Sequence, residues 1–129
     1  MEQSQFRIWL KQHEIEHEEK WLEQFISACN GDEQAMVNTA LLYKEYGQYD
    51  EMYGLLCKAS EQQNREAIYE LGNCYFEELG EKGSEQQAFL LYKSAAHLGH
   101  PDAMNNLADM YLNGEGTAVD EQQALSWFK

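Results

Sequence analysis

The sequence predicts an all-α protein, an α-solenoid of antiparallel helix pairs with an extra N-terminal helix. Three observations indicate this fold. The segment AIYELGNCY (67–75) recurs as AMNNLADMY (103–111), 36 residues further along the chain, and a period of this length is typical of solenoids. Within each copy, small and apolar residues follow helical spacing. The 129 residues contain a single proline and many Ala, Leu, Glu and Gln, which favour helix.

The N-terminal segment, residues 1–31, is predicted to be a helix that caps the stack or forms a dimer. Its end, residues 27–31, corresponds to residues 95–99 of a later repeat, which indicates a half-repeat helix. One apolar stripe comprises Phe6, Trp9, Leu10 and Trp21, and a second, on nearly the opposite side, comprises Ile8, Ile15, Leu22, Ile26 and Cys29. A helix with two apolar sides bends near residues 18–20 or contacts two neighbours. The second neighbour could be another copy of the chain, so a homodimer is one expectation.

Residues 32–64 form the first and least regular of about three repeats. Three of its residues match the repeated small and aromatic positions: Ala35, Ala40 and Tyr43. Its offset from the next copy is four residues shorter, and the loss falls in the loop around Gly47. Thr39 stands where the later copies have leucine, which predicts weaker packing there.

Residues 65–100 and 101–129 repeat without slippage, and EQQA recurs at 85–88 and 121–124. The last repeat is incomplete, because it stops before the small residues and glycine that end the previous copy. Trp127 and Phe128 would then be partly uncovered, which favours further repeats, a dimer or a partner at this open C-terminal helix.

Several residues have predicted roles in shaping these helices. The small residues Gly72 and Ala108 would let a neighbouring helix come close. Ser84 and Asp120 stand just before second helices, where a side-chain oxygen can cap free backbone amides. Asp102 follows a proline at a helix start, where a carboxylate favours the helix dipole.

The compound pattern A-x3-L-G/A-x2-Y, a glycine-containing loop, E-Q-Q-A-x2-W/Y and A-A-x2-G resembles Sel1-like repeats, relatives of tetratricopeptide repeats. Residues from about 65 to 129 carry this resemblance, residues 32–64 match loosely, and residues 1–31 barely match. The resemblance implies a right-handed superhelix with a concave, partner-binding face. Such proteins serve as adaptors in many pathways, so the pattern predicts a kind of function without naming a partner.

In this family the first helix of each pair lines the concave face, and alignment on Thr39, Leu71 and Leu107 transfers that face to this chain. The predicted partner-binding residues are Val37, Asn38, Leu41, Glu66, Tyr69, Glu70, Asn73, Phe76, Glu77, Asp102, Asn105, Asn106, Asp109 and Leu112. Gln34, Lys44, Glu45 and Asn113 fall on the same face.

These residues combine three chemistries. The apolar members would hold apolar side chains, the asparagines would bond an extended backbone, and the carboxylates would favour Lys or Arg. Lys44 is the only cation on the face, which disfavours capture of a terminal carboxylate. The alternative is that some apolar members pack between repeats and the acids are ordinary solvated surface.

The segment His13-Glu14-Ile15-Glu16-His17 matches H-E-x-x-H, a pattern that places two zinc-binding imidazoles one helical turn apart. A zinc hydrolase also needs a third ligand, an open coordination position and a cleft. His97 and His100 lie in the repeat scaffold. We interpret HEIEH as a charged stretch of helix, and expect no metal and no other cofactor.

The formal net charge of −14, from 23 acidic and 9 basic side chains, disfavours nucleic acid and anionic lipid as partners. It would attract a basic protein or peptide, although it could also serve solubility alone. No Walker loop or G-x-S-x-G is present, and Gly114-Glu115-Gly116 is interpreted as an inter-helix turn.

The three cysteines, Cys29, Cys57 and Cys74, form no C-x-x-C motif and are odd in number, as expected for buried thiols in a reducing compartment. No apolar run is long enough to span a bilayer, and the N-terminus lacks a secretory pattern. A cytoplasmic location is therefore expected.

Together these observations predict a non-catalytic adaptor or scaffold module that binds a basic protein or peptide on its concave face. A narrower alternative is a cytoplasmic immunity or inhibitor protein that neutralises a basic toxin or nuclease. A zinc-dependent hydrolase acting through HEIEH is a remote alternative.

Overall fold

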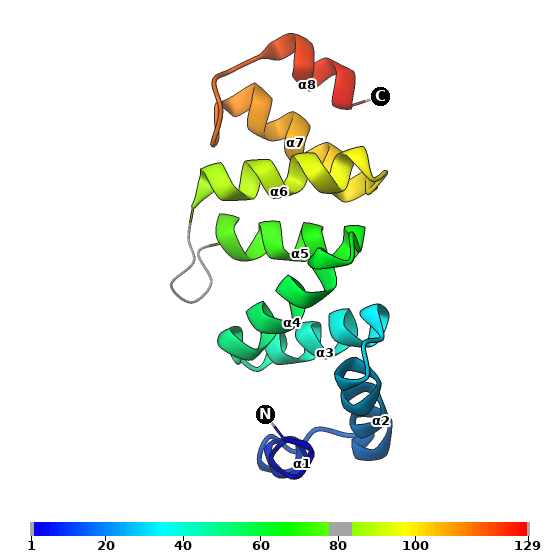
Figure 1. The fold of residues 1–129 in the computed structure, drawn as a ribbon. Coiled ribbons are helices and arrows are strands. Elements are labelled where there is room, and N and C mark those ends of the chain that lie inside the picture. Colours follow the sequence, from blue (N-terminus) through cyan, green and yellow to red (C-terminus); the bar gives the residue numbers. More distant parts are fainter. Residues whose placement is uncertain (1, 78–83, 129) are drawn as a thin grey trace. The chain divides into compact units, whose positions relative to one another are not determined.

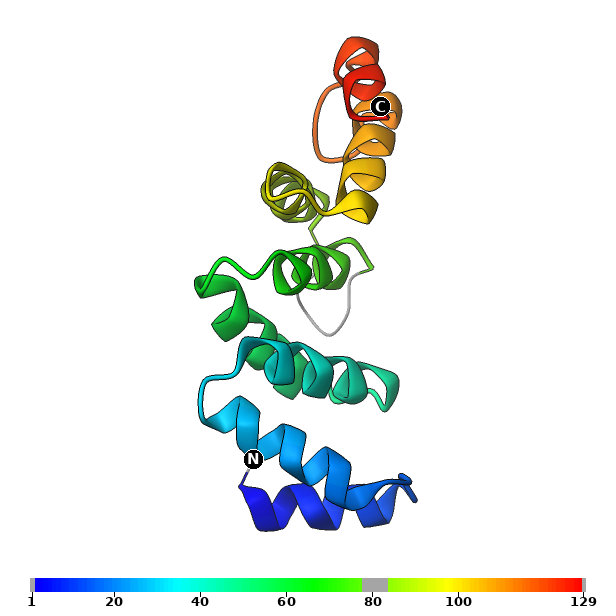
Figure 2. The same cartoon turned by 90° about the vertical axis from the view of Figure 1, so that its right-hand side faces the viewer.

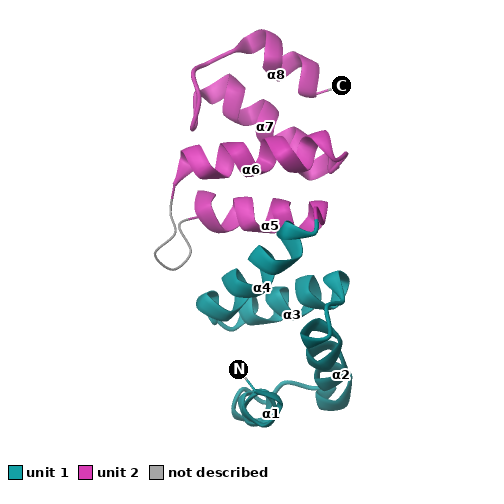
Figure 3. Cartoon of the chain, viewed as in Figure 1, with its two compact units in different colours: residues 1–62 teal, residues 63–129 magenta. Residues whose placement is uncertain are grey.

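The computed structural model describes residues 2–77 and 84–128 (Figure 1). Within these residues it contains eight α-helices and no strand, which confirms the predicted all-α class. No helix in the described part is both long and apolar enough to cross a membrane. The chain divides into two compact units, residues 1–62 (unit 1) and residues 63–129 (unit 2), coloured separately in Figure 3.

Unit 1 consists of four helices that each contact the next one along the chain. They are α1 (Gln3–Gln12), α2 (Glu18–Cys29), α3 (Glu33–Glu45) and α4 (Tyr49–Glu61). Successive helices run in alternating directions, so the chain folds back after each one (Figure 2). The pair α3 and α4 corresponds to the predicted first repeat.

Unit 2 also consists of four helices that each contact the next one along the chain. They are α5 (Arg65–Phe76), α6 (Glu85–His97), α7 (Pro101–Asn113) and α8 (Glu121–Trp127). Their core includes Ile68, Phe89, Tyr92, Leu107 and Met110. Leu71 and Leu107 occupy equivalent buried positions, the seventh residue of α5 and of α7.

The N-terminal segment differs from the prediction, because it forms two helices in place of one. The chain reverses between α1 and α2, where Glu14 and His17 adopt left-handed backbone angles (φ 52° and 62°). This reversal stacks Phe6 on Phe25 with ring centroids 4.4 Å apart. Each predicted apolar stripe is therefore divided between α1 and α2 and does not lie on one helix. Most of the second stripe is on the surface, since Ile8, Ile26 and Cys29 are exposed.

Each helix pair of the repeats closes with the same backbone hydrogen bond. The amide of the residue before the second helix donates to the carbonyl of the repeated tyrosine. These bonds join Gln48 to Tyr43 (2.8 Å), Ser84 to Tyr75 (2.9 Å) and Asp120 to Tyr111 (2.8 Å). Because the first pair keeps this bond with a shorter connection, its four missing residues fall in the loop, as predicted.

The first helices of the three pairs also start alike. A side chain before each helix accepts a hydrogen bond from the amide three residues on, which satisfies a backbone donor that has no partner within the helix. The bonds join Asp32 to Ala35 (2.9 Å), Asn64 to Ala67 (2.9 Å) and His100 to Ala103 (3.2 Å). The predicted caps of the second helices are confirmed, since Ser84 accepts from Gln87 and Asp120 from Gln123.

Position 39 differs from the equivalent positions of the later repeats, which carry leucine. Thr39 is fully buried, and its hydroxyl has no hydrogen-bond partner among the described residues. A buried hydroxyl without a partner costs free energy that the leucines at the equivalent positions avoid.

Gly72 allows α6 to approach α5 closely, which confirms its predicted role. A Cβ atom added at Gly72 would lie 2.9 Å from Cε1 of Tyr92 and 3.4 Å from Cβ of Leu91. The ring of Tyr92 therefore lies directly against the backbone of α5. By contrast, a Cβ atom at Gly54 in α4 would meet no atom within 4 Å.

This contrast predicts opposite effects of the same substitution at two helical glycines. Gly54→Ala should raise the free energy of unfolding by about 0.5–1 kcal/mol, because alanine favours helix. Gly72→Ala should not raise the free energy of unfolding, since overpacking of the new methyl group against Tyr92 costs about 1–3 kcal/mol. Urea unfolding of the full chain measures both. Equal stabilisation by the two variants would show that Tyr92 does not restrict this position.

Candidate partner-binding site

A cavity of about 360 Å³ lies in unit 2 between α5 and α7. Its α5 wall is formed by Tyr69, Asn73, Phe76 and Glu77, and its α7 wall by Asn106, Asp109, Met110 and Asn113. Tyr92 of α6 and Glu115 of the loop after α7 complete the lining. On both helices these residues recur at spacings of three and four, so each wall is one helix face.

Tyr92 joins the helices around this cavity. Its side chain is only 2% exposed, and its hydroxyl donates a hydrogen bond of 2.5 Å to Oδ1 of Asn73. Burial raises the pKa of Tyr92 strongly, with further contributions from Tyr69 and Glu77, while a hydrogen bond with Asn106 acts in the lowering direction. Tyr92 therefore stays protonated and can act as a donor.

The lining of the cavity includes acidic residues. Glu77 at the end of α5, Asp109 on α7 and Glu115 in the following loop all line it, and its described lining contains no Lys, Arg or His. Nδ2 of Asn113 donates to Oε1 of Glu115 at 3.3 Å. Aromatic rings lie among these acids, and the ring centroids of Phe76 and Tyr92 are 6.3 Å apart.

The structure brings together six of the predicted partner-binding residues in this cavity: Tyr69, Asn73, Phe76, Glu77, Asn106 and Asp109. Asn113, which the transferred face also contains, joins them. The sequence prediction missed Tyr92, Met110 and Glu115. Two signals in the sequence could have indicated Tyr92. Gly72 leaves space beside its helix for a side chain of a neighbouring helix, and an aromatic residue recurs at the equivalent positions 92 and 128.

Other predicted residues of α5 and α7 lie outside the cavity. Asp102, Asn105 and Leu112 are exposed on α7 but do not line it, because the cavity faces the side of the helix that carries residues 106, 109, 110 and 113. On α5, Glu70 is half-buried outside the lining, and Glu66 is bonded to His100.

The predicted residues of α3 belong to unit 1 and have different surroundings. Asn38 and Leu41 line a separate cavity of about 390 Å³, together with Lys20, Trp21, Gln24, Leu42 and Glu45. The amide of Asn38 donates to Gln24 and accepts from Gln34, both at 3.1 Å. Val37 is only 1% exposed. It packs in the core, where a partner cannot reach it, so its place on the predicted face is corrected.

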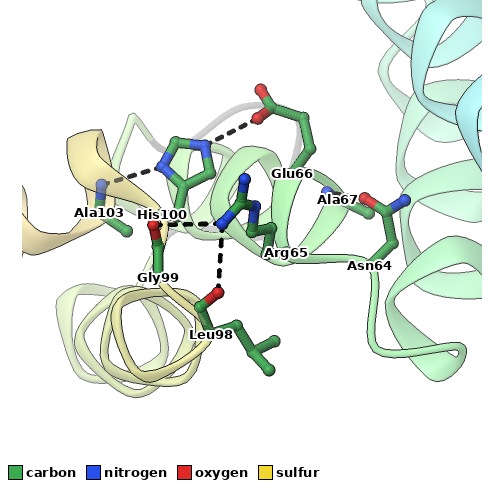
Figure 4. Close-up of polar contacts among 8 residues, drawn as sticks. All are labelled: Asn64, Arg65, Glu66, Ala67, Leu98, Gly99, His100 and Ala103. Carbon is green, nitrogen blue, oxygen red and sulfur yellow. Dashed lines mark hydrogen bonds and ion pairs between the residues drawn. The ribbon is translucent and has the colours of Figure 1, made fainter.

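A polar cluster next to the cavity connects α5 with the start of α7 (Figure 4). The amide of Ala103 donates to Nδ1 of His100, so the ring proton is on Nε2, which donates to Glu66 at 2.7 Å. Nη1 of Arg65 donates to the carbonyls of Leu98 and Gly99, each at 3.3 Å. His100 is 5% exposed and its ring stacks on Tyr69 with centroids 4.3 Å apart. This cluster therefore positions one aromatic wall of the cavity.

The HEIEH segment is not helical, which corrects the sequence interpretation. Residues 13–17 form the connection between α1 and α2. Nδ1 of His13 donates to the carbonyl of Trp9 at 3.0 Å, and His17 is the left-handed residue before α2. His13 and His17 therefore lack the one-turn helical relation on which the zinc pattern depends. In the described part of the chain, no group of three or more His, Cys, Asp or Glu side chains could hold a metal ion.

Comparison with known proteins identifies similar repeats. The family model described as Sel1 repeat matches residues 65–100 and 101–129. A protective antigen of uropathogenic Escherichia coli with an SLR fold is 29% identical and superposes with a TM-score of 0.81 over 87% of this chain. The chain spans only 25% of that antigen. A Sel1 repeat protein from Oxalobacter formigenes, 24% identical, has the same fold (TM-score 0.77; 81% of this chain and 83% of that one). No curated protein matches the sequence.

The cluster around His100 generates a stability prediction. His100→Ala removes both the cap of α7 and the bond to Glu66, and should lower the free energy of unfolding by about 1–3 kcal/mol. His100→Asn keeps a capping oxygen but cannot reach Glu66, and should recover about 1 kcal/mol of that loss. Thermal and urea unfolding of both variants test this. If asparagine were no better than alanine, the cap would contribute nothing at this position.

Proposed function

Because this chain belongs to the Sel1 repeat family, whose fold generally mediates protein–protein interaction, we propose that unit 2 binds a basic segment of a protein partner in the cavity between α5 and α7. The proposed function consists of binding and includes no catalytic step. Proteins with Sel1 repeats are typically non-catalytic scaffolds. The chain then acts as an adaptor.

The charge of the cavity is the observation that carries this proposal. Asp109 and Glu115 line it, and the whole chain has a formal net charge of −14. A basic partner is attracted both by the net charge of the chain and by the carboxylates of the cavity. The overall charge steers its approach, and the local carboxylates fix its position once bound.

The asparagines of the two walls support a polypeptide as the ligand. Asn73 and Asn106 come from facing helices, and a side-chain amide can both donate and accept, as an extended backbone requires. Exposed Phe76 adds an apolar contact surface at the rim. A chain segment with basic side chains and free backbone groups can use all three kinds of contact.

Selection from a random displayed peptide library tests this function on the full chain. We expect the recovered peptides to be enriched in Lys and Arg, and their binding to weaken as salt is added, because exposed charges are screened. Recovery of peptides without a basic excess, or binding that is insensitive to salt, would contradict the proposal.

Two matched substitutions on α7 locate the binding surface. Asp109→Asn should weaken binding of a selected peptide by about 3- to 10-fold, since it removes a charge that lines the cavity. Asp102→Asn removes the same charge from an exposed position outside the lining and should change affinity less than about twofold. Fluorescence anisotropy with labelled peptide measures both. Equal losses would show that only total charge matters and would exclude this cavity as the site.

A further inference from the structure

The cavity between α5 and α7 combines three features that one kind of side chain uses together. Carboxylates face it from the end of α5, from α7 and from the loop after α7. Three aromatic residues, Tyr69, Phe76 and Tyr92, contribute to its lining. Amide groups of Asn73 and Asn106 also line it. We infer that this cavity is a specificity pocket for a single arginine side chain of the partner, an inference that rests on the proposed function.

The aromatic lining favours arginine over lysine. A guanidinium is planar and weakly hydrated, so it stacks on a ring face while its edge still donates hydrogen bonds. Phe76 is 38% exposed and its ring centroid lies 6.3 Å from that of Tyr92, so an entering planar group meets aromatic surface. A lysine ammonium is a compact, strongly hydrated charge and gains less from these rings.

The distribution of acceptors also matches a guanidinium. Asp109 on α7 and Glu115 in the following loop both line the cavity, so it holds carboxylates from two different segments. A guanidinium carries five N–H donors in a fixed fork and can bond to more than one carboxylate at once. The cavity volume of about 360 Å³ exceeds that of one side chain, which leaves room for bridging water.

Other side chains fit the pocket less well. An apolar side chain would remove water from Asp109 and Glu115 without replacing its hydrogen bonds, which costs free energy. An acidic side chain would be repelled by Asp109 and Glu115. A neutral side chain with the shape of arginine, citrulline, would keep the hydrogen-bonding edge but lose the charge, and so separates shape from electrostatics.

The test uses the full chain labelled with ¹⁵N and three small probes: acetyl-arginine-N-methylamide, its lysine counterpart and its citrulline counterpart. The arginine probe should shift backbone amides of Asn73, Asn106 and Asp109 in a saturable way. Its affinity should exceed that of the lysine probe by about threefold or more, because stacking adds to charge attraction. Citrulline should produce no saturable shifts at these amides. Equal affinities for arginine and lysine, or saturable shifts confined to other residues, would overturn the inference.

Matched phenylalanine substitutions test the role of the ring. Phe76→Leu keeps an apolar side chain in the lining but removes the aromatic face, so the preference for arginine over lysine should fall towards one. Phe128→Leu changes an exposed phenylalanine outside the cavity and should leave that preference unchanged. An unchanged preference in Phe76→Leu would contradict stacking on this ring.

The two proposals fail in different ways. A chain that selects basic peptides but treats the arginine and lysine probes alike retains the proposed function and loses the arginine pocket. A chain that selects no basic peptides loses both.

Discussion

The contact between Gly72 and Tyr92 is the constraint on which the candidate site depends. Because position 72 has no side chain, the Tyr92 ring lies against the backbone of α5, and its hydroxyl reaches Asn73 on the same helix. This fixes a buried aromatic residue of α6 between the two helix faces that form the cavity walls. The missing Cβ atom at position 72 thus leaves room for Tyr92, which lines the cavity.

Much of the fold could be predicted from the sequence, because the same residue types recur at equivalent positions of successive repeats. The tyrosine carbonyls that close the last two pairs and the caps before Ala67 and Ala103 recur at the sequence offset of 36 residues. The N-terminal segment has no such copy. Its apolar residues fit helical spacing across residues 13–17, but burial of Phe6 against Phe25 requires a reversal that periodicity alone does not reveal.

The candidate site could be predicted only in part, since transfer by family resemblance gives helix faces and not neighbours. It placed Tyr69, Asn73 and Asp109 on faces that the structure brings around one cavity. It missed Tyr92, which comes from a second helix, and it included Val37, which packing buries. Glu66 was treated as available to a partner, yet it is bonded to His100, a pairing between residues 34 positions apart.

The proposed function requires a partner to lie on the α5 and α7 faces around Tyr92. Hydrogen–deuterium exchange of the full chain, with and without a peptide selected by it, measures where the partner binds. Bound peptide should slow exchange in residues 69–77 and 104–115 and leave α4 and α8 unchanged. Slower exchange confined to unit 1 or to α8 would contradict the proposed function.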